Sequence, residues 1–359
     1  MTTMLPMPRV RPSGEDGRPV VPASGGRGAL RDRFGRVASD LRISLTDRCN
    51  LRCTYCMPAE GLDWMPQEQV LSDAEVVRLV RVGVERLGIT TVRLTGGEPL
   101  LRRDLEQLVA DLAVLEPRPV IALTTNGIGL ARRAGGLAAA GLDRINISLD
   151  TLQPETFAAL TRRRRLEDVL AGVRSARVAG LDPVKVNTVL MRGLNDDEAV
   201  PLLRWAMAEG VQLRFIEQMP LDAQHAWQRS TMVTAAEIWD RLNAELPLVE
   251  DPADVLARGS APAELFRVAA TGHRVGIIAA VSKPFCGSCD RVRLTADGQI
   301  RTCLFSRTES DLRAPLRSGA SDAELADQWL AAVAGKQAGH GIDDPSFLQP
   351  DRPMSAIGG

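Results

Sequence analysis

Six cysteines carry the most distinctive chemistry of this sequence, and they fall into two groups of three. The first group lies in TDRCNLRCTYCM with the spacing C-x3-C-x2-C, and the second lies in FCGSCDRVRLTADGQIRTCLF. In chain order the six residues are Cys49, Cys53, Cys56, Cys286, Cys289 and Cys303. A structural zinc ion takes four ligands and a redox pair needs two thiols, so a group of three fits neither site. The chain has three histidines, and none is near the first group.

Three thiolates are what an iron–sulfur cluster with an open position requires. A 4Fe–4S cluster is held by thiolates at its corners, so three cysteines leave one iron free to bind another molecule. We therefore interpret each group as a cluster site with an open iron. An unrelated zinc or redox site at the first group, and a zinc knuckle lacking one ligand at the second, stay open as alternatives. Disulfides are not expected in a cytosolic chain.

The composition describes a globular protein of the cytoplasm. The 359 residues are 45% hydrophobic and 25% charged, which is enough for one large domain or two ordinary ones. The net charge of −1 gives no basic field for nucleic acid or an anionic membrane. We expect no membrane span and no signal peptide, because no apolar run approaches ~20 residues. Only three of the 44 basic residues are lysines, so each lysine stands out.

Alternating strand and helix patterns begin near residue 40. Runs rich in Val, Ile and Thr predict strands at 41–46, 90–97, 120–127, 144–150, 184–191 and 211–219. Helical stretches separate them, and the clearest begins with a capping box of Ser72 and Glu75 and ends at Gly88. Six strand–helix units predict an α/β fold with a parallel sheet, specifically a partial (β/α)6 TIM-type barrel.

Three regions are expected along the chain. Residues 1–38 are interrupted by Pro and Gly and predict a disordered N-terminal tail. Residues 39–222 contain the six units and form the barrel core. Residues 223–359 form a C-terminal α+β extension packed beside the barrel, which carries the second cysteine group. Two hairpins are predicted there, with turns at Thr-Gly (271–272) and Asp-Gly (297–298).

The carboxyl ends of the predicted strands are polar without an obvious structural need. Thr46 leads into the first cysteines, the second strand ends in GGEP (96–99), and the third ends in TTNG (124–127). Ser148 and Asp150 close the fourth strand. Each residue alone could equally be part of a turn or a cap. Because functional groups of a (β/α) barrel collect at this end of the strands, together they predict a pocket.

Two of these motifs resemble signatures of the radical S-adenosylmethionine family. The resemblance rests on C-x3-C-x2-C after the first strand, with an aromatic residue before the last cysteine, and on GGEP after the second strand. It implies that the open iron of the first cluster binds S-adenosylmethionine, which one electron cleaves to methionine and a 5′-deoxyadenosyl radical. The residues implied to line this cofactor site are Tyr55, Gly97, Ser148 and Met219.

The second cysteine group narrows the resemblance to the GTP 3′,8-cyclase family of molybdenum cofactor biosynthesis. DRVRLT (290–295) and the terminal MSAIGG (354–359) match it, as do RLTGGEPLLR, LTTNG, VKVNTVL and RFIEQMP in order. The resemblance runs from about Leu30 to the end of the chain. One departure is Asp290, where relatives often carry Asn, and we expect little consequence from it. The resemblance implies that the second group holds a second 4Fe–4S cluster, whose open iron binds guanine.

The reaction implied by this resemblance converts GTP to (8S)-3′,8-cyclo-7,8-dihydroguanosine 5′-triphosphate. The 5′-deoxyadenosyl radical takes hydrogen from ribose C3′, and the carbon radical attacks C8 of guanine. The product passes to cyclic pyranopterin monophosphate synthase, and a flavodoxin or ferredoxin is the expected electron donor. A homodimer is expected from relatives. The residues implied to be catalytic are Arg291, Arg293, Gly358 and Gly359.

Basic residues within apolar strands are the candidates for the triphosphate of GTP. A charge in such a strand is costly unless it is paired, and arginine binds phosphate through bidentate hydrogen bonds. Arg291 and Arg293 alternate along one strand and therefore share a face. With the resemblance, GTP contacts are predicted for Arg42, Arg93, Thr124, Lys185, Arg291, Val292 and Arg293. The run RRRR at 162–165 is instead expected in a solvated loop.

Two other classes of function stay open. One is a radical S-adenosylmethionine enzyme that modifies a peptide with the help of an auxiliary cluster, although such enzymes usually carry more cysteines and lack DRVRLT. The other is a non-catalytic metal-binding regulator, which has no need for GGEP or for polar strand ends. Iron and sulfide content separates them, since two four-iron clusters require about eight irons per chain and the regulator would hold zinc without sulfide.

Overall fold

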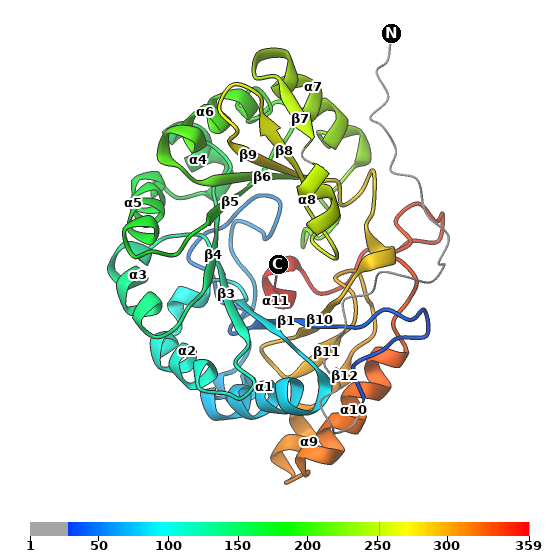
Figure 1. Ribbon diagram of the computed structural model, residues 1–359. Coiled ribbons are helices and arrows are strands. Elements are labelled where there is room, and N and C mark those ends of the chain that lie inside the picture. The colour runs from blue at the N-terminus through cyan, green and yellow to red at the C-terminus, as the bar shows by residue number, and fades with distance from the viewer. Residues whose placement is uncertain (1–27, 251, 359) are drawn as a thin grey trace.

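A single sheet of twelve strands organises the chain. The computed structural model describes residues 28–250 and 252–358. The strands are ordered β12-β11-β10-β1-β2-β3-β4-β5-β6-β9-β8-β7. In Figure 1 the sheet curves into an open barrel, with most helices outside it and the C-terminal helix α11 (Met354–Ile357) within the curve.

The six strands predicted from the sequence are all present, and they are parallel to one another. They are β1 (Asp40–Ser44), β2 (Thr91–Thr95), β3 (Val120–Thr125), β4 (Arg144–Ser148), β5 (Val184–Val189) and β6 (Gln212–Ile216). Two further strands continue this parallel set, because β10 (Arg291–Leu294) pairs with β1 and β9 (Arg274–Ile278) pairs with β6. The C-terminal extension therefore does not pack beside the barrel as expected. Its strands extend the barrel sheet at both sides.

Both predicted hairpins are confirmed at the two edges of the sheet. β8 (Glu264–Val268) runs antiparallel to β9, and β11 (Gln299–Arg301) runs antiparallel to β10. The turns place Gly272 at φ 70° and Gly298 at φ 78°, a region that favours glycine. The outermost strands are β7 (Leu248–Glu250) and β12 (Ser310–Asp311).

The principal helices connect the strands and cover the outside of the sheet (Figure 1). In chain order they are α1 (Asp73–Leu87), α2 (Leu105–Ala113), α3 (Leu130–Ala139), α4 (Pro154–Thr161), α5 (Leu166–Val178), α6 (Ala199–Glu209), α7 (Ala235–Glu245), α8 (Pro252–Ala257), α9 (Arg313–Arg317) and α10 (Asp322–Ala334). The predicted capping box of α1 is confirmed: the Ser72 hydroxyl accepts from the Glu75 amide, and the Glu75 carboxylate accepts from the Ser72 amide. Among the described residues, no helix is long and apolar enough to span a bilayer.

Alternation along each strand divides its side chains between the core and the barrel interior. On β1, Leu41 and Ile43 are fully buried in the hydrophobic core under the helices, so Asp40, Arg42 and Ser44 face the other way. The same alternation turns polar side chains of the neighbouring strands inward. The barrel interior is therefore a polar space enclosed by an apolar shell.

Part of the segment predicted to be a disordered N-terminal tail is folded. Residues 1–27 lie outside the described part of the chain, but residues 28–38 are folded. Leu30 is fully buried, and the Asp32 carboxylate accepts from the backbone of Phe34 and from Arg36. Arg36 also donates to the carbonyl oxygen of Cys286 at 2.7 Å, so this segment is part of the fold around the second cysteine group.

Candidate active site

The first cysteine group follows β1 in a loop at the carboxyl end of the barrel. Arg52 stiffens this loop, because its guanidinium donates to the carbonyl oxygens of Cys49 at 2.7 Å and Leu51 at 2.8 Å. The Arg162 guanidinium binds the loop from outside, with bonds to the carbonyl oxygens of Arg52 at 2.7 Å and Met57 at 3.2 Å. The expected solvated position of RRRR is thus wrong for Arg162, while the other three arginines are exposed.

GGEP supports the cysteine loop through contacts that require glycine. Gly96 has φ 138°, and a Cβ atom there would overlap the carbonyl oxygen of Thr46. A Cβ atom on Gly97 would overlap the carbonyl oxygen of Arg48 and lie 2.5 Å from that of Asp47. The two backbones can approach this closely only because neither glycine has a side chain.

Glu98 of the same motif connects the ends of β2 and β3. Its buried carboxylate accepts from the Thr125 hydroxyl at 2.7 Å and from the Asn126 amide at 2.7 Å. Burial raises the pKa of Glu98 to about 7, even though these hydrogen bonds act to lower it. Asn126 in turn donates to Asn50 at 2.7 Å and toward the sulfur of Cys49 at 3.8 Å. The motif therefore positions the loop both by shape and through hydrogen bonds.

Burial dominates the titration of the first cysteine group. Burial first, and the nearby Cys49 second, raise the pKa of Cys56 to about 12. Burial and then Cys56 raise the pKa of Cys53 well above its usual range. Beside them, the Tyr55 hydroxyl donates to Asp150 at 2.7 Å. Thiols that influence one another in this way lie close together, and they ionise when a metal replaces their protons.

The second cysteine group is surrounded by cations. Arg291 Nε and Lys336 Nζ both donate to the sulfur of Cys289, each at 3.4 Å. Lys336 is only 3% exposed, and it also donates to the carbonyl oxygens of Cys289 and Arg291. Burial acts to raise the pKa of Cys289, but the charges of Arg291 and Lys336 lower it to about 7. These contacts favour a negatively charged sulfur.

The two cysteine groups lie at opposite ends of one pair of strands. The first group follows the carboxyl end of β1. Cys289 precedes β10, which is parallel to β1 with Asp40 beside Arg291. Because β11 runs back along β10, Cys303 returns to the same amino end as Cys289. A strand rises ~3.3 Å per residue, so the five residues of β1 span roughly 16 Å between the two ends.

Three arginines form a row across the barrel between these ends. Arg42 of β1 is in register with Arg93 of β2 on one side and with Arg293 of β10 on the other. Neighbouring strands lie ~4.8 Å apart, so three like charges are forced together on one face of the sheet. Like charges directly opposite one another destabilise a sheet, and a bound anion would offset this repulsion.

Burial and mutual repulsion shift the pKa values of these cations. The pKa of Arg42 falls to about 10 through burial first and then through neighbouring arginines, against the opposing charge of Asp40. Lys185 of β5 has a pKa lowered to about 7, by burial and then by Arg214 and other arginines. Burial also lowers the pKa of Arg214, on β6, to about 10. The interior thus concentrates positive charge in a low-dielectric space.

Several of the inward-facing side chains have buried polar atoms without a hydrogen-bond partner in the described structure. They are Arg42, Arg93, Thr124, Asn187, Arg214 and Arg291. Most buried polar atoms of native proteins are hydrogen-bonded, so a cluster of exceptions calls for an explanation. Cationic donors with free N–H groups on one face of a sheet are the pattern expected of a site for a multiply charged anion.

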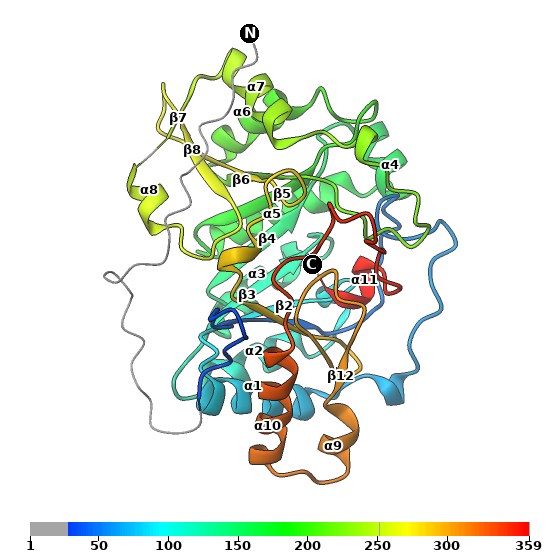
Figure 2. The same cartoon turned by 90° about the vertical axis from the view of Figure 1, so that its right-hand side faces the viewer.

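The C-terminal segment enters this interior. In both ribbon views α11 lies within the curve of the sheet (Figure 1 and Figure 2). Gly358 has φ 77°, and a Cβ atom there would lie 2.5 Å from the Ser44 hydroxyl and 2.7 Å from a methyl carbon of Thr95. Its carbonyl oxygen accepts a hydrogen bond from the Arg293 guanidinium. The segment therefore connects the carboxyl end of the barrel with the arginine row.

The cysteine groups fit iron–sulfur clusters in their donors and surroundings. All six cysteines are free thiols, partly buried, with N–H donors directed at Cys49 and Cys289. Such donors are typical of cluster thiolates. Across the described ranges, no three His, Cys, Asp or Glu side chains are grouped to hold a single metal ion. Cluster cysteines instead bind separate irons.

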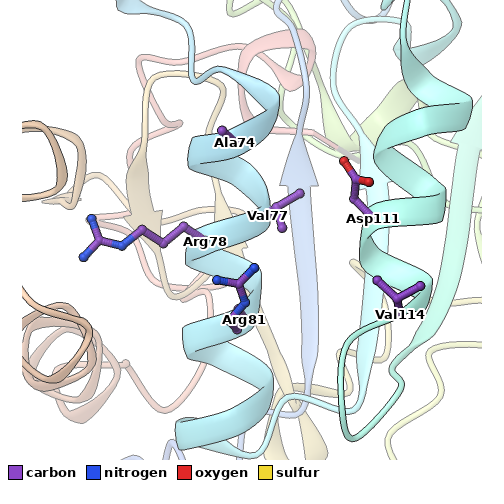
Figure 3. Close-up of a pocket in the computed structure, with 6 residues that line it drawn as sticks. All are labelled: Ala74, Val77, Arg78, Arg81, Asp111 and Val114. Carbon is purple, nitrogen blue, oxygen red and sulfur yellow. The ribbon is translucent and has the colours of Figure 1, made fainter.

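A shallow surface depression lies outside this interior. It sits between α1 and α2 and is drawn in Figure 3, lined by Ala74, Val77, Arg78, Arg81, Asp111 and Val114. Arg78 there is already bonded to Asp322 at 2.9 Å. None of the predicted site residues lines it.

Two family models match the chain on either side of residue 210. The model of the Radical SAM superfamily matches residues 43–206, and the model described as Molybdenum Cofactor Synthesis C matches residues 211–342. The first covers the end of β1, the cysteine loop and β2 to β5. The second covers both C-terminal hairpins and the second cysteine group.

Curated relatives match almost the whole length. A GTP 3′,8-cyclase of Streptomyces coelicolor is 61% identical over 93% of this chain and 97% of its own. A GTP 3′,8-cyclase of Mycolicibacterium smegmatis is 58% identical over 99% of both chains. The chain belongs to the GTP 3′,8-cyclase family. A third member of the family, from Corynebacterium glutamicum, is 57% identical over 94% of this chain and 91% of its own.

Solved structures share the fold of this cyclase family member at low sequence identity. SuiB of Streptococcus suis, bound to S-adenosylmethionine, superposes with a TM-score of 0.56 at 13% identity, over 83% of this chain and 67% of SuiB. The enzyme anSMEcpe with bound AdoMet gives 0.55 at 15% identity, over 84% of this chain and 82% of its own. These likenesses confirm the α/β fold with a partial barrel.

Most of the site residues predicted from the sequence are brought together in this fold. Those predicted to contact GTP face the interior, with the exception of Val292, whose side chain is 1% exposed in the core. Val292 can reach the interior only with its backbone. Tyr55, Gly97 and Ser148 lie at the carboxyl end of the barrel, and Met219 packs between two hydrophobic clusters of the C-terminal region. Gly359 lies outside the described residues.

Sequence reasoning missed three cations that the cyclase fold brings to the site. Arg214 and Arg144 lie in or at the start of apolar strands and raise the local positive charge around Lys185. The rule that selected Arg42 and Arg93 would have found Arg214. Lys336 is one of three lysines in the chain, which was a signal, but its contact with Cys289 depends on how α10 packs.

Proposed function

We propose that this chain is a radical S-adenosylmethionine enzyme that converts GTP to (8S)-3′,8-cyclo-7,8-dihydroguanosine 5′-triphosphate, the first step of molybdenum cofactor biosynthesis. One observation of the structure carries the proposal: a row of three arginines, one buried and two partly buried, lies between two three-cysteine groups at opposite ends of the barrel. The row suits a triphosphate, and membership of the GTP 3′,8-cyclase family supports that identity for the anion.

Two clusters would be held by the two cysteine groups. Cys49, Cys53 and Cys56 would hold one 4Fe–4S cluster, and Cys286, Cys289 and Cys303 would hold the other. When bound, the clusters supply the electron that cleaves S-adenosylmethionine at the first site and an open iron for guanine at the second. Asn126 and Lys336 direct N–H donors at the sulfurs of Cys49 and Cys289, and thereby stabilise their negative charge.

S-Adenosylmethionine would bind at the carboxyl end of the barrel. The close approach of Gly97 to the cysteine loop places its backbone beside the first group. Tyr55 is fixed by its bond to Asp150, and Ser148 faces the interior from the end of β4. We place Met219, which follows β6, at the same carboxyl end of the barrel as Tyr55 and Ser148.

GTP would bind along the arginine row, with its phosphates on the cations and its guanine toward the second cysteine group. Arg42, Arg93 and Lys185 present charge to the phosphates, and Thr124 adds a buried hydroxyl without a partner in the described structure. Arg291 bridges the region between Cys289 and the row, since its Nε binds the sulfur while its NH2 group is unpartnered. Bidentate arginine contacts fix both position and orientation.

The barrel would control the reaction by placement and by excluding water. Transfer of hydrogen from ribose C3′ requires that carbon to lie next to the 5′ carbon of the cofactor. Holding the two ligands in this relative position lowers the activation barrier of the transfer. The C-terminal segment closes the interior beside Ser44 and Thr95. The bond from Arg293 to Gly358 joins that closure to the GTP site, which is the basis for assigning catalytic roles to both residues and, by extension, to Gly359.

We infer the partners from the chemistry of the substrates. A one-electron carrier such as flavodoxin or ferredoxin would reduce the first site, and cyclic pyranopterin monophosphate synthase would consume the product. A cytoplasmic location agrees with a cytosolic pool of GTP. A homodimer remains a prediction that size-exclusion chromatography with light scattering would check.

An anaerobic incubation tests the function directly. Reconstituted protein is mixed with S-adenosylmethionine, dithionite and GTP, and 5′-deoxyadenosine and any new isomer of GTP are quantified by chromatography and mass spectrometry. Comparable amounts of both products are expected. Formation of 5′-deoxyadenosine without an isomer of GTP would point to another substrate, with a peptide as the next candidate. Formation of neither, in protein shown to contain its clusters, would overturn the interpretation of C-x3-C-x2-C.

A further inference from the structure

The C-terminal segment has little local structure of its own to hold it in the barrel. Helix α11 has four residues, and isolated helices shorter than ~12 residues are marginal in water. Near its start the Met354 amide donates to the carbonyl oxygen of Leu221 at 3.2 Å, and the Ser355 backbone is bonded to the Cys56 thiol. Contacts made by the residues just before the helix would add to these bonds in keeping Ser355 beside Cys56 and Gly358 beside Arg293.

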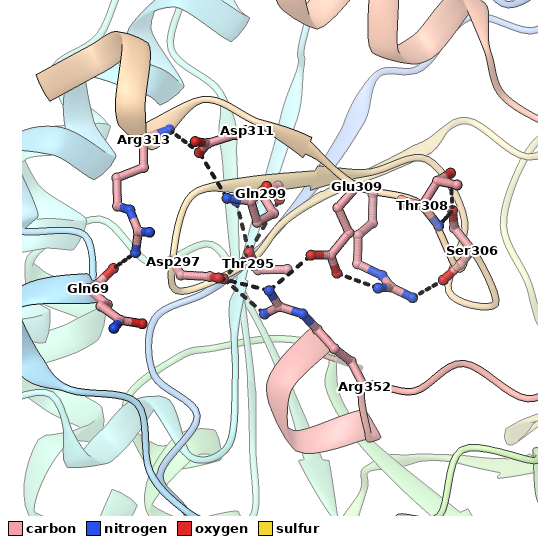
Figure 4. Close-up of polar contacts among 11 residues, drawn as sticks. Gln69, Thr295, Asp297, Gln299, Ser306, Thr308, Glu309, Asp311, Arg313 and Arg352 are labelled. Atoms are coloured by element: carbon pink, nitrogen blue, oxygen red, sulfur yellow. Dashed lines mark hydrogen bonds and ion pairs between the residues drawn. The ribbon is translucent and has the colours of Figure 1, made fainter. Parts of the chain in front are cut away.

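Arg352, two residues before this helix, is held by two carboxylates. Its guanidinium donates to both oxygens of Asp297, at 3.0 and 2.8 Å, and its NH2 group lies 2.9 Å from Glu309 (Figure 4). The Arg352 side chain is 28% exposed, and those of Asp297 and Glu309 are 12% and 19% exposed. A bidentate, largely buried arginine–carboxylate contact fixes orientation as well as position.

The carboxylates that hold Arg352 are themselves held by the β10–β11 hairpin. Asp297 lies in the turn of that hairpin and accepts from the Thr295 hydroxyl at 2.5 Å. Glu309 accepts from Arg301 of β11 at 2.5 Å. Burial acts to raise the pKa of Asp297, but the bonds from Arg352 and Thr295 lower it below its usual value, so the carboxylate is ionised at neutral pH. The two carboxylates that bind Arg352 are thus fixed in place by further contacts with Thr295 and Arg301.

The same hairpin carries groups of the substrate site. Arg291 and Arg293 lie on β10, and Cys303 follows β11 by two residues. Arg352 is three residues before Ser355 and six before Gly358. The contact therefore joins the segment that reaches the first cysteine group to the hairpin that carries the second.

We propose that Arg352 is a positioning residue, and that its contact with Asp297 and Glu309 seats residues 353–358 in the barrel. The contact sets the distance between Gly358 and Arg293 from the outside of the site. Its role in catalysis rests on the proposed function, but its role in placing the segment does not.

Hydrogen exchange measured by mass spectrometry on the cluster-loaded protein tests the placement. Arg352→Gln removes the charge and the bidentate geometry, so amide exchange in residues 353–358 is expected to accelerate at least about tenfold, with little change in β1 to β6. Arg352→Lys keeps a charge but not the planar fork, and an intermediate acceleration is expected. Wild-type exchange of this segment in Arg352→Gln would overturn the proposal.

Arg307→Gln is the matched control. Arg307 reaches Asp351, the residue before Arg352, at 3.8 Å, with side chains 47% and 80% exposed. Exposed pairs of this kind contribute little, so exchange in residues 353–358 is expected to stay at the wild-type rate. Acceleration equal to that of Arg352→Gln would contradict a specific role for Arg352.

Glu309→Gln tests the receptor side without changing Arg352 or the turn. It is expected to accelerate exchange of the segment by a smaller factor than Arg352→Gln. In the GTP assay, Arg352→Gln is expected to lower kcat at least about tenfold, with the KM for GTP changed less, and Arg352→Lys to restore part of kcat. If the wild-type protein makes no GTP isomer, the proposed function fails while the exchange result still decides the placement. Unchanged kcat with accelerated exchange would overturn the catalytic part alone.

Discussion

At the scale of single residues, Lys185 links the GTP site to pH. Its pKa is lowered to about 7, chiefly by burial and then by Arg214, so it loses its charge as pH rises through 7. A bound triphosphate favours the charged form, so binding above pH 7 must take up a proton. We expect the affinity for GTP to fall as pH rises, by up to about tenfold per pH unit until the pKa of the complex is passed.

Equilibrium binding of GTP to the cluster-loaded protein between about pH 7 and 9 measures this, because phosphate groups are largely ionised there. The Lys185→Met variant should bind GTP more weakly, and its affinity for GTP should fall less steeply as pH rises. Lys283→Met is the control. It removes an ion pair with Glu264 and leaves Lys185 in place, so the dependence of GTP affinity on pH should match that of the wild type. An identical slope in wild type and Lys185→Met would rule out Lys185 as the titrating group.

Lys336 is predicted to set the reduction potential of the second cluster. Its buried ammonium contacts the sulfur of Cys289, so it stabilises added negative charge. Lys336→Met should make the potential more negative by an amount on the order of 100 mV, for one charge lost at an effective dielectric constant near 20. A spectroscopically monitored redox titration, in protein whose first three cysteines are serine, measures it. A potential that stays the same or rises would show that the charge has no such role.

At the scale of elements, GGEP and the cysteine loop form one unit. Gly97→Ala would place a methyl group on the carbonyl oxygens of Asp47 and Arg48, so the loop must move. Iron content is expected to fall from about eight to about four per chain, because only the first site is disturbed. Iron and sulfide analysis measures this, together with thermal unfolding to confirm the fold.

Gly135→Ala is the control for that substitution. Gly135 lies in α3 with open space around it, so alanine should leave iron content unchanged and stabilise the helix by about 0.5–1 kcal/mol. Full iron content in Gly97→Ala would mean that the close contact is not needed to form the first site.

At the scale of the whole molecule, the two cysteine groups are separable. They lie at opposite ends of β1 and β10 and are held by different loops. Cys286→Ser is therefore expected to keep S-adenosylmethionine binding and to lose formation of the GTP isomer, in the assay described above. Ser288→Ala, whose exposed hydroxyl contacts only the carbonyl oxygen of Phe285 among the described residues, should retain both. Wild-type product formation by Cys286→Ser would exclude the second group from a role in the reaction.

Asp290 joins the second cysteine group to the start of β1. Its carboxylate accepts from the hydroxyls of Ser39 at 3.2 Å and Ser260 at 2.7 Å, and its carbonyl oxygen accepts from the amides of Ser39 and Asp40. It therefore fixes the start of β1 beside Cys289, while the expectation that Asp in place of Asn has little consequence stays a prediction.

The sequence alone determined the features that depend on local order. The six parallel strands, the capping box of α1 and both hairpins follow from residue periodicity and from turn residues that adjacent chain segments carry with them. The cysteine groups and GGEP were visible because their members are close in sequence. Arg42, Arg93 and Lys185 were recognised as candidate GTP contacts because each is a charged residue within an apolar strand. This too is a local pattern, since strand alternation fixes which side chains share a face.

Only the tertiary structure decided how these pieces meet. Pairing of β10 with β1 places Arg293 beside Arg42 and sends the two cysteine groups to opposite ends of the barrel, although residues 42 and 293 are far apart in sequence. Three further features likewise depend on segments that are distant in the chain. They are the folded state of residues 28–38, the contact of Lys336 with Cys289 and the contact of Arg352 with Asp297. Such contacts form through packing and charge in the folded state, and no local pattern encodes which distant partner will be adjacent.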